Sequence, residues 1–184
     1  MPVLRTRKPK AQPTWSDVKA KLIDFDRVQL LSLLADLYSA SHDNQTFLHT
    51  RFALGEDPLK VHKQTISRWL YPDVQTREVV SLAKARKAIT DYRRAVGKPE
   101  GLAELMTHYC EEASAFATDL GLDDGDFYNA LVSMFENALT MVAKLEAGSQ
   151  APFRERLEVV RARSNSYGYC AGDSINDLWE RLAT

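Results

Sequence analysis

One flank of a single predicted helix gathers four side chains that could bind a metal ion or transfer a proton. Along the segment Pro99–Leu120 they stand at positions i, i+4, i+7 and i+8, as Glu104, His108, Glu111 and Glu112. Glu104, His108 and Glu112 are the best candidate metal ligands in the chain. A di-iron bundle would need Glu-x-x-His motifs on two helices, and only one histidine lies in the second half of the sequence. We therefore expect a solvated histidine flanked by carboxylates and no cofactor, and we keep a metal-dependent enzyme as an alternative.

Charge is distributed unevenly between two adjacent segments. Residues 60–98 contain ten Lys or Arg and three acidic residues, whereas residues 99–146 contain one Lys and ten acidic residues. Phosphates could bind to cations that recur at helical spacing, without any reading of bases. We call this candidate binding surface the basic ridge and assign to it Lys60, Arg68, Lys84, Lys87, Arg94 and Lys98.

Two interpretations of the basic ridge stay open. In the first, Lys63, Arg86 and Arg93 extend a nucleic-acid surface, and Trp69 or Tyr71 stacks on a base if its ring is exposed. In the second, the acidic helices that follow neutralise the ridge, either across helical hairpins or between copies of the chain. The net charge of −1 favours the second, because a dedicated nucleic-acid binder is commonly basic overall.

The remaining histidines and the cysteines lack the spacing of a known site. His42, His49 and His62 have no Cys, Asp or Glu at a familiar ligand spacing, so we expect partly buried structural histidines. Cys110 and Cys170 are too few for a disulfide scaffold and too far apart for a zinc knuckle. We expect both to be buried free thiols. No histidine lies near Cys170 in sequence to activate its thiol, so the sequence does not indicate a nucleophile there.

Two further segments resemble ion sites without meeting their requirements. Asp119 begins a run of aspartates through Asp126, but a calcium loop needs Gly at its sixth and Glu at its twelfth position, where Asp124 and Ala130 stand. We expect helix capping there. The segment 168–174 has two glycines before a helix but no phosphate-binding Lys, so it predicts a turn and a cap.

Composition limits the class of protein. A chain of 184 residues with 45% hydrophobic residues can bury a substantial core, and no run approaches the roughly 18 apolar residues of a membrane span. Eight Gly and seven Pro are few for an all-β chain with many tight turns. No apolar stretch follows the basic N-terminus, so we expect no secretory signal and a soluble, cytoplasmic protein without a membrane partner.

Apolar residues recur every three or four positions along most of the chain. The stripe Val28, Leu30, Leu31, Leu34 and Leu37 is so broad that we expect its helix to be buried on most sides. Helix ends follow from caps, prolines and glycines, with Gly148 stopping the seventh helix. The predicted helices are about 14–23, 26–37, 44–54, 57–71, 82–96, 99–120, 126–145, 152–163 and 174–182, and 71–76 is a connector.

These elements predict an all-α fold. Eight or nine antiparallel helices joined by short turns must pack as helical hairpins, in a short curved HEAT-like array or in a bundle. We favour the array. We expect a flexible basic tail over residues 1–13 and a single helical domain over residues 14–184.

Several segments together resemble a bacterial family of small all-helical proteins that is described only as a domain of unknown function. The resemblance covers roughly residues 17–182 and implies the fold, but no activity and no site residue. It rests on the order and spacing of Leu30–Tyr38, Leu82–Tyr92, Asp126–Asn129, Met134–Phe135, the Gly168 loop and Leu178–Trp179.

The sequence therefore favours a non-enzymatic protein-interaction or scaffold module with an unknown protein partner, or one that self-associates. Sequence-independent nucleic-acid binding through the basic ridge is the first alternative. A metal-dependent enzyme built on Glu104, His108 and Glu112 is the second.

Overall fold

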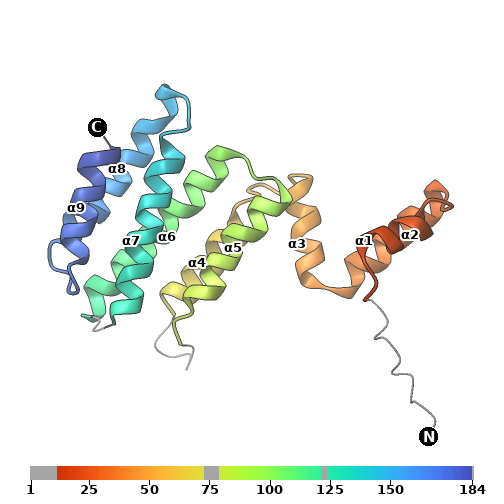
Figure 1. Ribbon diagram of the computed structural model, residues 1–184, viewed down its shortest axis with the longest axis horizontal. Helices are drawn as coiled ribbons and strands as arrows, with labels where there is room; N and C mark the ends of the chain where they lie inside the picture. The colour runs from red at the N-terminus through yellow and green to blue at the C-terminus, as the bar shows by residue number, and fades with distance from the viewer. Residues whose placement is uncertain (1–11, 73–78, 122–123, 184) are drawn as a thin grey trace, which may run out of the picture. The chain divides into compact units, whose positions relative to one another are not determined.

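The computed structural model describes residues 12–72, 79–121 and 124–183 (Figure 1). Within these ranges it contains nine helices and no strand, and 77% of the described residues are helical. The all-α prediction is confirmed. Most of the predicted basic tail, 1–11, and residues 73–76 of the predicted connector lie outside the described residues.

The chain divides into two compact units, Met1–Gln45 and Thr46–Thr184, where the sequence predicts a single domain over 14–184. The first unit holds α1 (Trp15–Leu22) and α2 (Arg27–Ala40), and α3 (His42–Arg51) crosses the boundary. Neither α1 nor α2 contains a buried residue. The described part of the first unit therefore has no core of its own.

Side-chain caps fix where α1 and α2 begin. The Asp17 carboxylate accepts hydrogen bonds from the backbone and hydroxyl of Thr14. Asp26 accepts from the Gln29 backbone at 2.8 Å while the Gln29 side chain accepts from the Asp26 backbone, which is a capping box. Both helix starts were predicted, but the expected burial of α2 on most sides is wrong. Its leucines require a cover that the described part of the first unit does not supply.

The second unit is built from three successive helical pairs. They are α4 (Lys60–Leu70) with α5 (Leu82–Ala95), α6 (Pro99–Leu120) with α7 (Gly125–Val142), and α8 (Ala147–Ser164) with α9 (Ala171–Leu182). The helices of each pair pack together, and α6 also packs against α4 and α8. Residues distant in sequence therefore meet along the face that α4, α6 and α8 share.

Local sequence signals account for most helix ends in this unit. α6 begins at Pro99 and ends before Gly121, as predicted; Gly121 has a φ of 59°, a left-handed conformation that glycine adopts without strain. Gly148 does not stop a helix as expected. Gly148 lies in the first turn of α8, because the turn between α7 and α8 is already complete near Leu145. α8 therefore begins five residues before Pro152, where its start was predicted.

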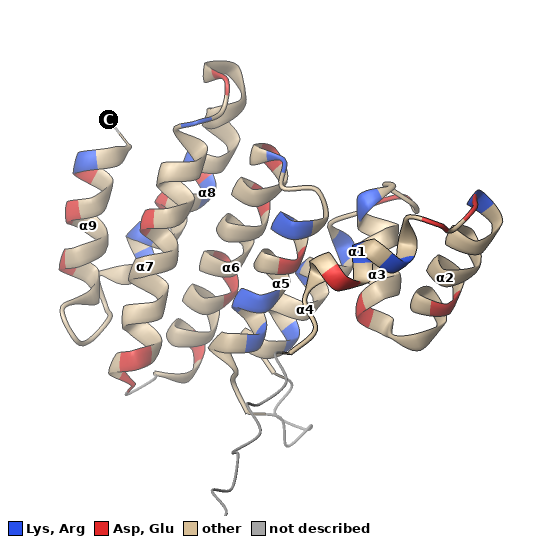
Figure 2. Cartoon of the chain, turned by 45° about the vertical axis from the view of Figure 1, so that its right-hand side comes forward, with Lys and Arg blue, Asp and Glu red and all other residues tan. Residues whose placement is uncertain are grey.

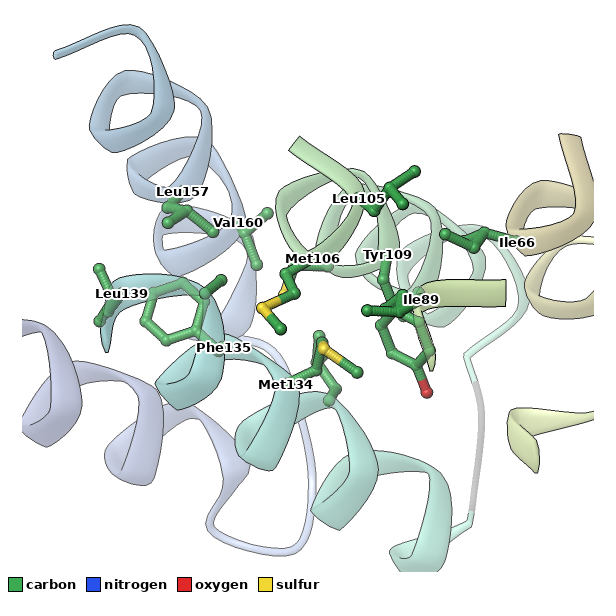
Figure 3. Close-up of a cluster of buried hydrophobic side chains, with 14 of the residues drawn as sticks. Ile66, Ile89, Leu105, Met106, Tyr109, Met134, Phe135, Leu139, Leu157 and Val160 are labelled. Atoms are coloured by element: carbon green, nitrogen blue, oxygen red, sulfur yellow. The ribbon is translucent and has the colours of Figure 1, made fainter. Parts of the chain in front are cut away.

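A continuous hydrophobic core joins the three pairs (Figure 3). Tyr109 on α6 and Phe135 on α7 are its largest fully buried side chains together with Phe127. In Figure 3 the labelled side chains of α6 lie between those of α4 and α5 and those of α7 and α8. This core makes the second unit a stable support for the surface residues described next.

Candidate functional site

Polar side chains from three helices form one connected cluster on the second unit. α6 packs against α4 on one side and α8 on the other, so residues 41 to 52 positions apart come into hydrogen-bonding contact. We call this cluster the polar network; its members are Lys63, Ser67, Glu104, His108, Glu111, Glu112 and Arg156.

The Arg156 guanidinium is the centre of the polar network. Its Nε and Nη2 donate to the two carboxylate oxygens of Glu111, each at 2.7 Å, and its Nη1 donates to Glu104 at 2.6 Å. The other oxygen of Glu104 lies 2.7 Å from Lys63 Nζ. Two cations therefore neutralise two carboxylates and join α4, α6 and α8. Because planar, charge-assisted pairs of this kind are geometrically specific, they fix the register of the three helices.

The electrostatics of the polar network follow from these contacts. Partial burial acts to raise the pKa of Glu104, but the hydrogen bonds from Arg156 and Lys63 outweigh it and hold that pKa below its usual value. The carboxylate of Glu111 raises the pKa of Arg156 further above its ordinary range. Glu104 and Arg156 are therefore both ionised at neutral pH.

Ser67 and His108 have the separation of a nucleophile and its base, with Oγ 2.9 Å from Nε2. Acyl transfer also needs a group that orients the imidazole and donors that stabilise the oxyanion. Glu111 Oε2 is 3.9 Å from His108 Nδ1, too long for a hydrogen bond, and the same oxygen is held by Arg156. Ser67 lies inside α4, where backbone N–H groups bond within the helix. The pair therefore links α4 to α6 as a structural contact.

An open pocket of about 520 Å³ lies beside the polar network. Val159 and Val160 supply apolar surface, and the phenol of Tyr71 at its edge donates to Asp119 at 2.7 Å. The charged groups at this pocket are of both signs, so it does not select one class of ion. Its lining residues are Tyr71, Glu111, Glu112, Ala115, Arg156, Val159, Val160 and Arg163.

The candidate metal ligands Glu104, His108 and Glu112 contact other side chains and are not arranged around a common point for a metal ion. Glu104 is bound to Lys63 and Arg156, while Glu112 lies 3.6 Å from His108 Nε2. Across the described ranges, no group of three or more His, Cys, Asp or Glu side chains could hold a metal ion. The carboxylates that the sequence brings to one flank of α6 are arranged to receive cationic side chains.

All six residues of the basic ridge are exposed, and α4 and α5, which carry most of them, pack together. Figure 2 shows Lys and Arg positions recurring along α5. Part of this charge is engaged locally, since Lys87 Nζ lies 2.7 Å from Asp91 on the same helix. Lys63, one turn beyond Lys60, pairs with Glu104 across helices. Neutralisation by the following acidic helix is therefore observed for Lys63.

The two aromatic rings suggested for base stacking are already in contact with other groups. Lys84 Nζ lies 3.6 Å from the centre of the Trp69 ring, and the Arg68 guanidinium lies 5.3 Å from it. Tyr71 packs edge-to-face on Phe116, with 5.6 Å between ring centres. A base would have to displace Lys84 to stack on Trp69.

Several other sequence expectations can be compared with the structure. His62 is buried as expected and its Nε2 lies 3.0 Å from Thr50 Oγ1, but His42 and His49 are exposed. Cys110 is buried, whereas the expectation for Cys170 is wrong: it is exposed at the start of α9, because the turn before this helix lies on the surface.

Asp119, the first aspartate of the run, lies within α6, whereas Asp124 is the N-cap of α7, as predicted. Its carboxylate accepts from the backbone of Asp126 at 2.9 Å and of Phe127 at 3.1 Å at the start of α7. Asp123 lies outside the described residues. Gly168 and the two residues after it form a turn as predicted, but α9 begins at Ala171, three residues before the predicted start at Ser174.

α2 carries an exposed apolar surface where its sequence predicted a buried one. We call it the leucine face, formed by Leu30, Leu31, Leu34 and Leu37, all of them exposed. The same leucine pattern predicted burial, because periodicity shows which face must be covered but not by what. Other exposed large apolar residues of α1, α2 and their connection are Trp15, Val18, Ile23, Phe25, Val28 and Tyr38.

The fold and its surfaces define an all-α protein. Its second unit consists of three packed helical pairs, and its first unit exposes apolar side chains on α1 and α2. Comparison of the chain with protein-family models, with curated proteins and with solved structures finds no match. Within the described ranges, no helix combines the length and apolar character needed to cross a membrane.

Proposed function

We propose that this protein is a non-enzymatic protein-interaction module that binds its partner through the leucine face of α2. One observation carries the proposal: α1 and α2 are well-capped helices in which every described residue is at least partly accessible. Leucines on a helix surface are covered in a folded assembly, because leaving them in water costs about 25 cal/mol per Å² of apolar area. The uncovered face therefore marks an interaction site.

The size of the exposed surface supports this assignment. Each leucine of the leucine face remains about two-fifths or more accessible, which leaves on the order of several hundred Å² of apolar surface on α2 with its neighbours. A specific interface buries roughly 800 Å² on each partner. The exposed residues of α1 and α2 together approach that amount.

The polar network of the second unit supports the proposal, because its charged groups are already paired with one another. Arg156, Glu104 and Glu111 satisfy one another, and Ser67 is bonded to His108. A ligand at this place would have to break charge-assisted bonds that hold α4, α6 and α8 together. In this proposal the leucine face of the first unit is the interaction surface, and the protein acts in the cytoplasm, where an exposed thiol such as Cys170 stays reduced.

Affinity capture with matched variants tests the proposed function. Tagged wild-type protein, Leu31→Glu/Leu34→Glu and Ser32→Glu/Ser39→Glu are incubated with lysate that also contains untagged chain. The serine pair adds the same charge to exposed positions of the same helix. We expect a protein retained by the wild type and the serine variant and lost with the leucine variant. An identical set of bound proteins for all three would contradict the proposal.

A second candidate function, nucleic-acid binding, is favoured by the exposure of all six residues of the basic ridge. Lys84 is in contact with Trp69, so Arg94→Glu/Lys98→Glu is the better test, with Lys144→Glu/Arg163→Glu as a control of equal charge. Binding to labelled duplex DNA, single-stranded DNA and RNA is measured at low and near-physiological salt. Binding that falls with salt and is lost only in the ridge variant would establish this function, and no binding at low salt would exclude it.

A further inference from the structure

The leucine face forms one continuous seam along α2. Leu30, Leu34 and Leu37 follow at spacings of four and three, so they line one side of the helix, and Leu31 lies beside them. Their exposed fractions are 39%, 47%, 48% and 56% for Leu30, Leu34, Leu37 and Leu31. The capping box of Asp26 and Gln29 fixes the first turn, so the seam is carried by a formed helix.

The charges of α2 restrict what can cover the seam. Its only basic residue is Arg27, at the first helical position, and its only acidic residue is Asp36, on the side opposite the seam. Nucleic acid would require cations along the contact. A helix that lies on a membrane carries Lys and Arg on its polar face, whereas that face of α2 has Gln29, Ser32 and Asp36. The seam therefore fits an uncharged apolar helix.

The seam is complementary to itself when two helices run antiparallel. If the two-fold axis passes at Leu34, each residue i lies opposite residue 68 − i of the other helix. Leu34 then meets its own copy, Leu31 meets Leu37, and Leu30 meets the ring of Tyr38. The two Arg27 side chains lie at opposite ends, about 20 Å apart at a rise of 1.5 Å per residue. No like charges meet in this arrangement. The same apolar patch on each copy is therefore complementary to itself, as an isologous dimer requires.

Stoichiometry also favours a second copy. Among the described residues, α1 and α2 contain no buried side chain, so the leucines of α2 need a cover when the protein is folded. Another copy is the one partner always present in equal amount. We propose that two copies of this chain associate through antiparallel pairing of α2 across a two-fold axis at Leu34. This inference rests on the proposed function, because it names the partner of the same surface.

The first test is the mass of the full chain in solution as a function of concentration. We expect twice the chain mass of 20.8 kDa at tens of micromolar protein. Leu31→Glu/Leu34→Glu should raise the dimer dissociation constant by about 100-fold or more, because it places four carboxylates in an apolar interface. Ser32→Glu/Ser39→Glu should leave it unchanged. Helical circular dichroism confirms that each variant is folded. A wild-type chain that is still monomeric at about 100 micromolar would overturn the inference.

A cross-linking test does not depend on a destabilising substitution. In a Cys170→Ser background only the buried Cys110 remains, so a new surface cysteine is the sole reactive thiol. A short bis-maleimide should link Leu34→Cys into a covalent dimer, because this position meets its own copy at the axis. Ser32→Cys, on the opposite side of α2, should stay monomeric. Equal cross-linking of the two variants would overturn the proposed pairing.

The two experiments also separate this inference from the function on which it rests. A monomeric wild-type chain whose leucine variant still loses a captured protein would leave the interaction module standing and exclude the second copy as its partner. If the leucine variant changes neither the mass nor the captured proteins, both proposals fail.

Discussion

Arg156 on α8 binds Glu111 on α6 through two parallel hydrogen bonds, Nε to Oε1 and Nη2 to Oε2, each 2.7 Å long. Its Nη1 donates to Glu104, which lies about two turns before Glu111 on α6. Because Glu104 also binds Lys63, one guanidinium organises contacts among three helices. A planar group with donors on two edges is required for this, which distinguishes Arg from Lys at position 156.

Substitution Arg156→Lys should therefore lower the free energy of unfolding although the charge is kept. An ammonium group can hold one carboxylate but not the fork on Glu111, so we expect a loss of about 1–3 kcal/mol for this partly buried group. Urea denaturation measures it. Arg181→Lys is the control, because Arg181 and Glu136 are more than half exposed and 3.7 Å apart. Equal effects of the two substitutions would show that the fork has no special role.

The local part of this architecture could be predicted from the sequence. Pro99 and Gly121 bracket α6, and the carboxylates at positions 104, 111 and 112 do share its flank with the imidazole of His108. Their partners could not be predicted, since Arg156 lies 45 residues beyond Glu111 and only the packing of α6 on α8 brings it near. The same limit explains the error at α2: its leucine spacing is a local property, whereas burial depends on whether another element arrives to cover it.

His62 should make the stability of the protein depend on pH. Burial lowers the pKa of this imidazole, and the charge of Asp91 opposes the shift only in part. The unfolded chain therefore binds a proton first as pH falls below the ordinary value of 6.5, so stability is complete above this pH and decreases toward the lower folded pKa. His62→Gln should reduce the slope of the free energy of unfolding against pH between about pH 7.5 and about pH 5, measured by denaturant titrations.

The control for His62 is His42→Gln, which removes an exposed imidazole. It should leave the pH dependence as in the wild type. If His62→Gln retained the full slope, the dependence would have to arise from other groups, such as the carboxylate of Glu104, whose lowered pKa acts at more acidic pH.

The two cysteines should differ in reactivity toward a thiol reagent such as Ellman's reagent. Cys170 is exposed before α9, whereas Cys110 is fully buried on α6 and its burial raises the pKa of the thiol. We expect one thiol to react at once in native protein and the second only at the rate of unfolding. Cys170→Ser should abolish the fast phase. A fast phase of two thiols would contradict the burial of Cys110.

Two glycines inside helices should respond in opposite directions to replacement by alanine. A Cβ at Gly101 would lie 2.0 Å from the Tyr92 hydroxyl and 2.4 Å from the ring carbon that bears it. Tyr92 is buried and packs edge-to-face on His62, so its ring cannot move away freely. We expect Gly101→Ala to lower the free energy of unfolding by about 1–3 kcal/mol despite the better helix propensity of alanine.

Gly148 provides the matched comparison, because it also lies in a helix but nothing stands within 4 Å of a Cβ added there. Gly148→Ala should therefore raise the free energy of unfolding by up to about 1 kcal/mol, through the lower conformational entropy of the unfolded chain. Both variants are measured by urea denaturation against the wild type. Stabilisation by both would show that α5 and α6 are less closely packed at Tyr92 than these distances require, since only a shift of the ring could then accommodate the methyl group.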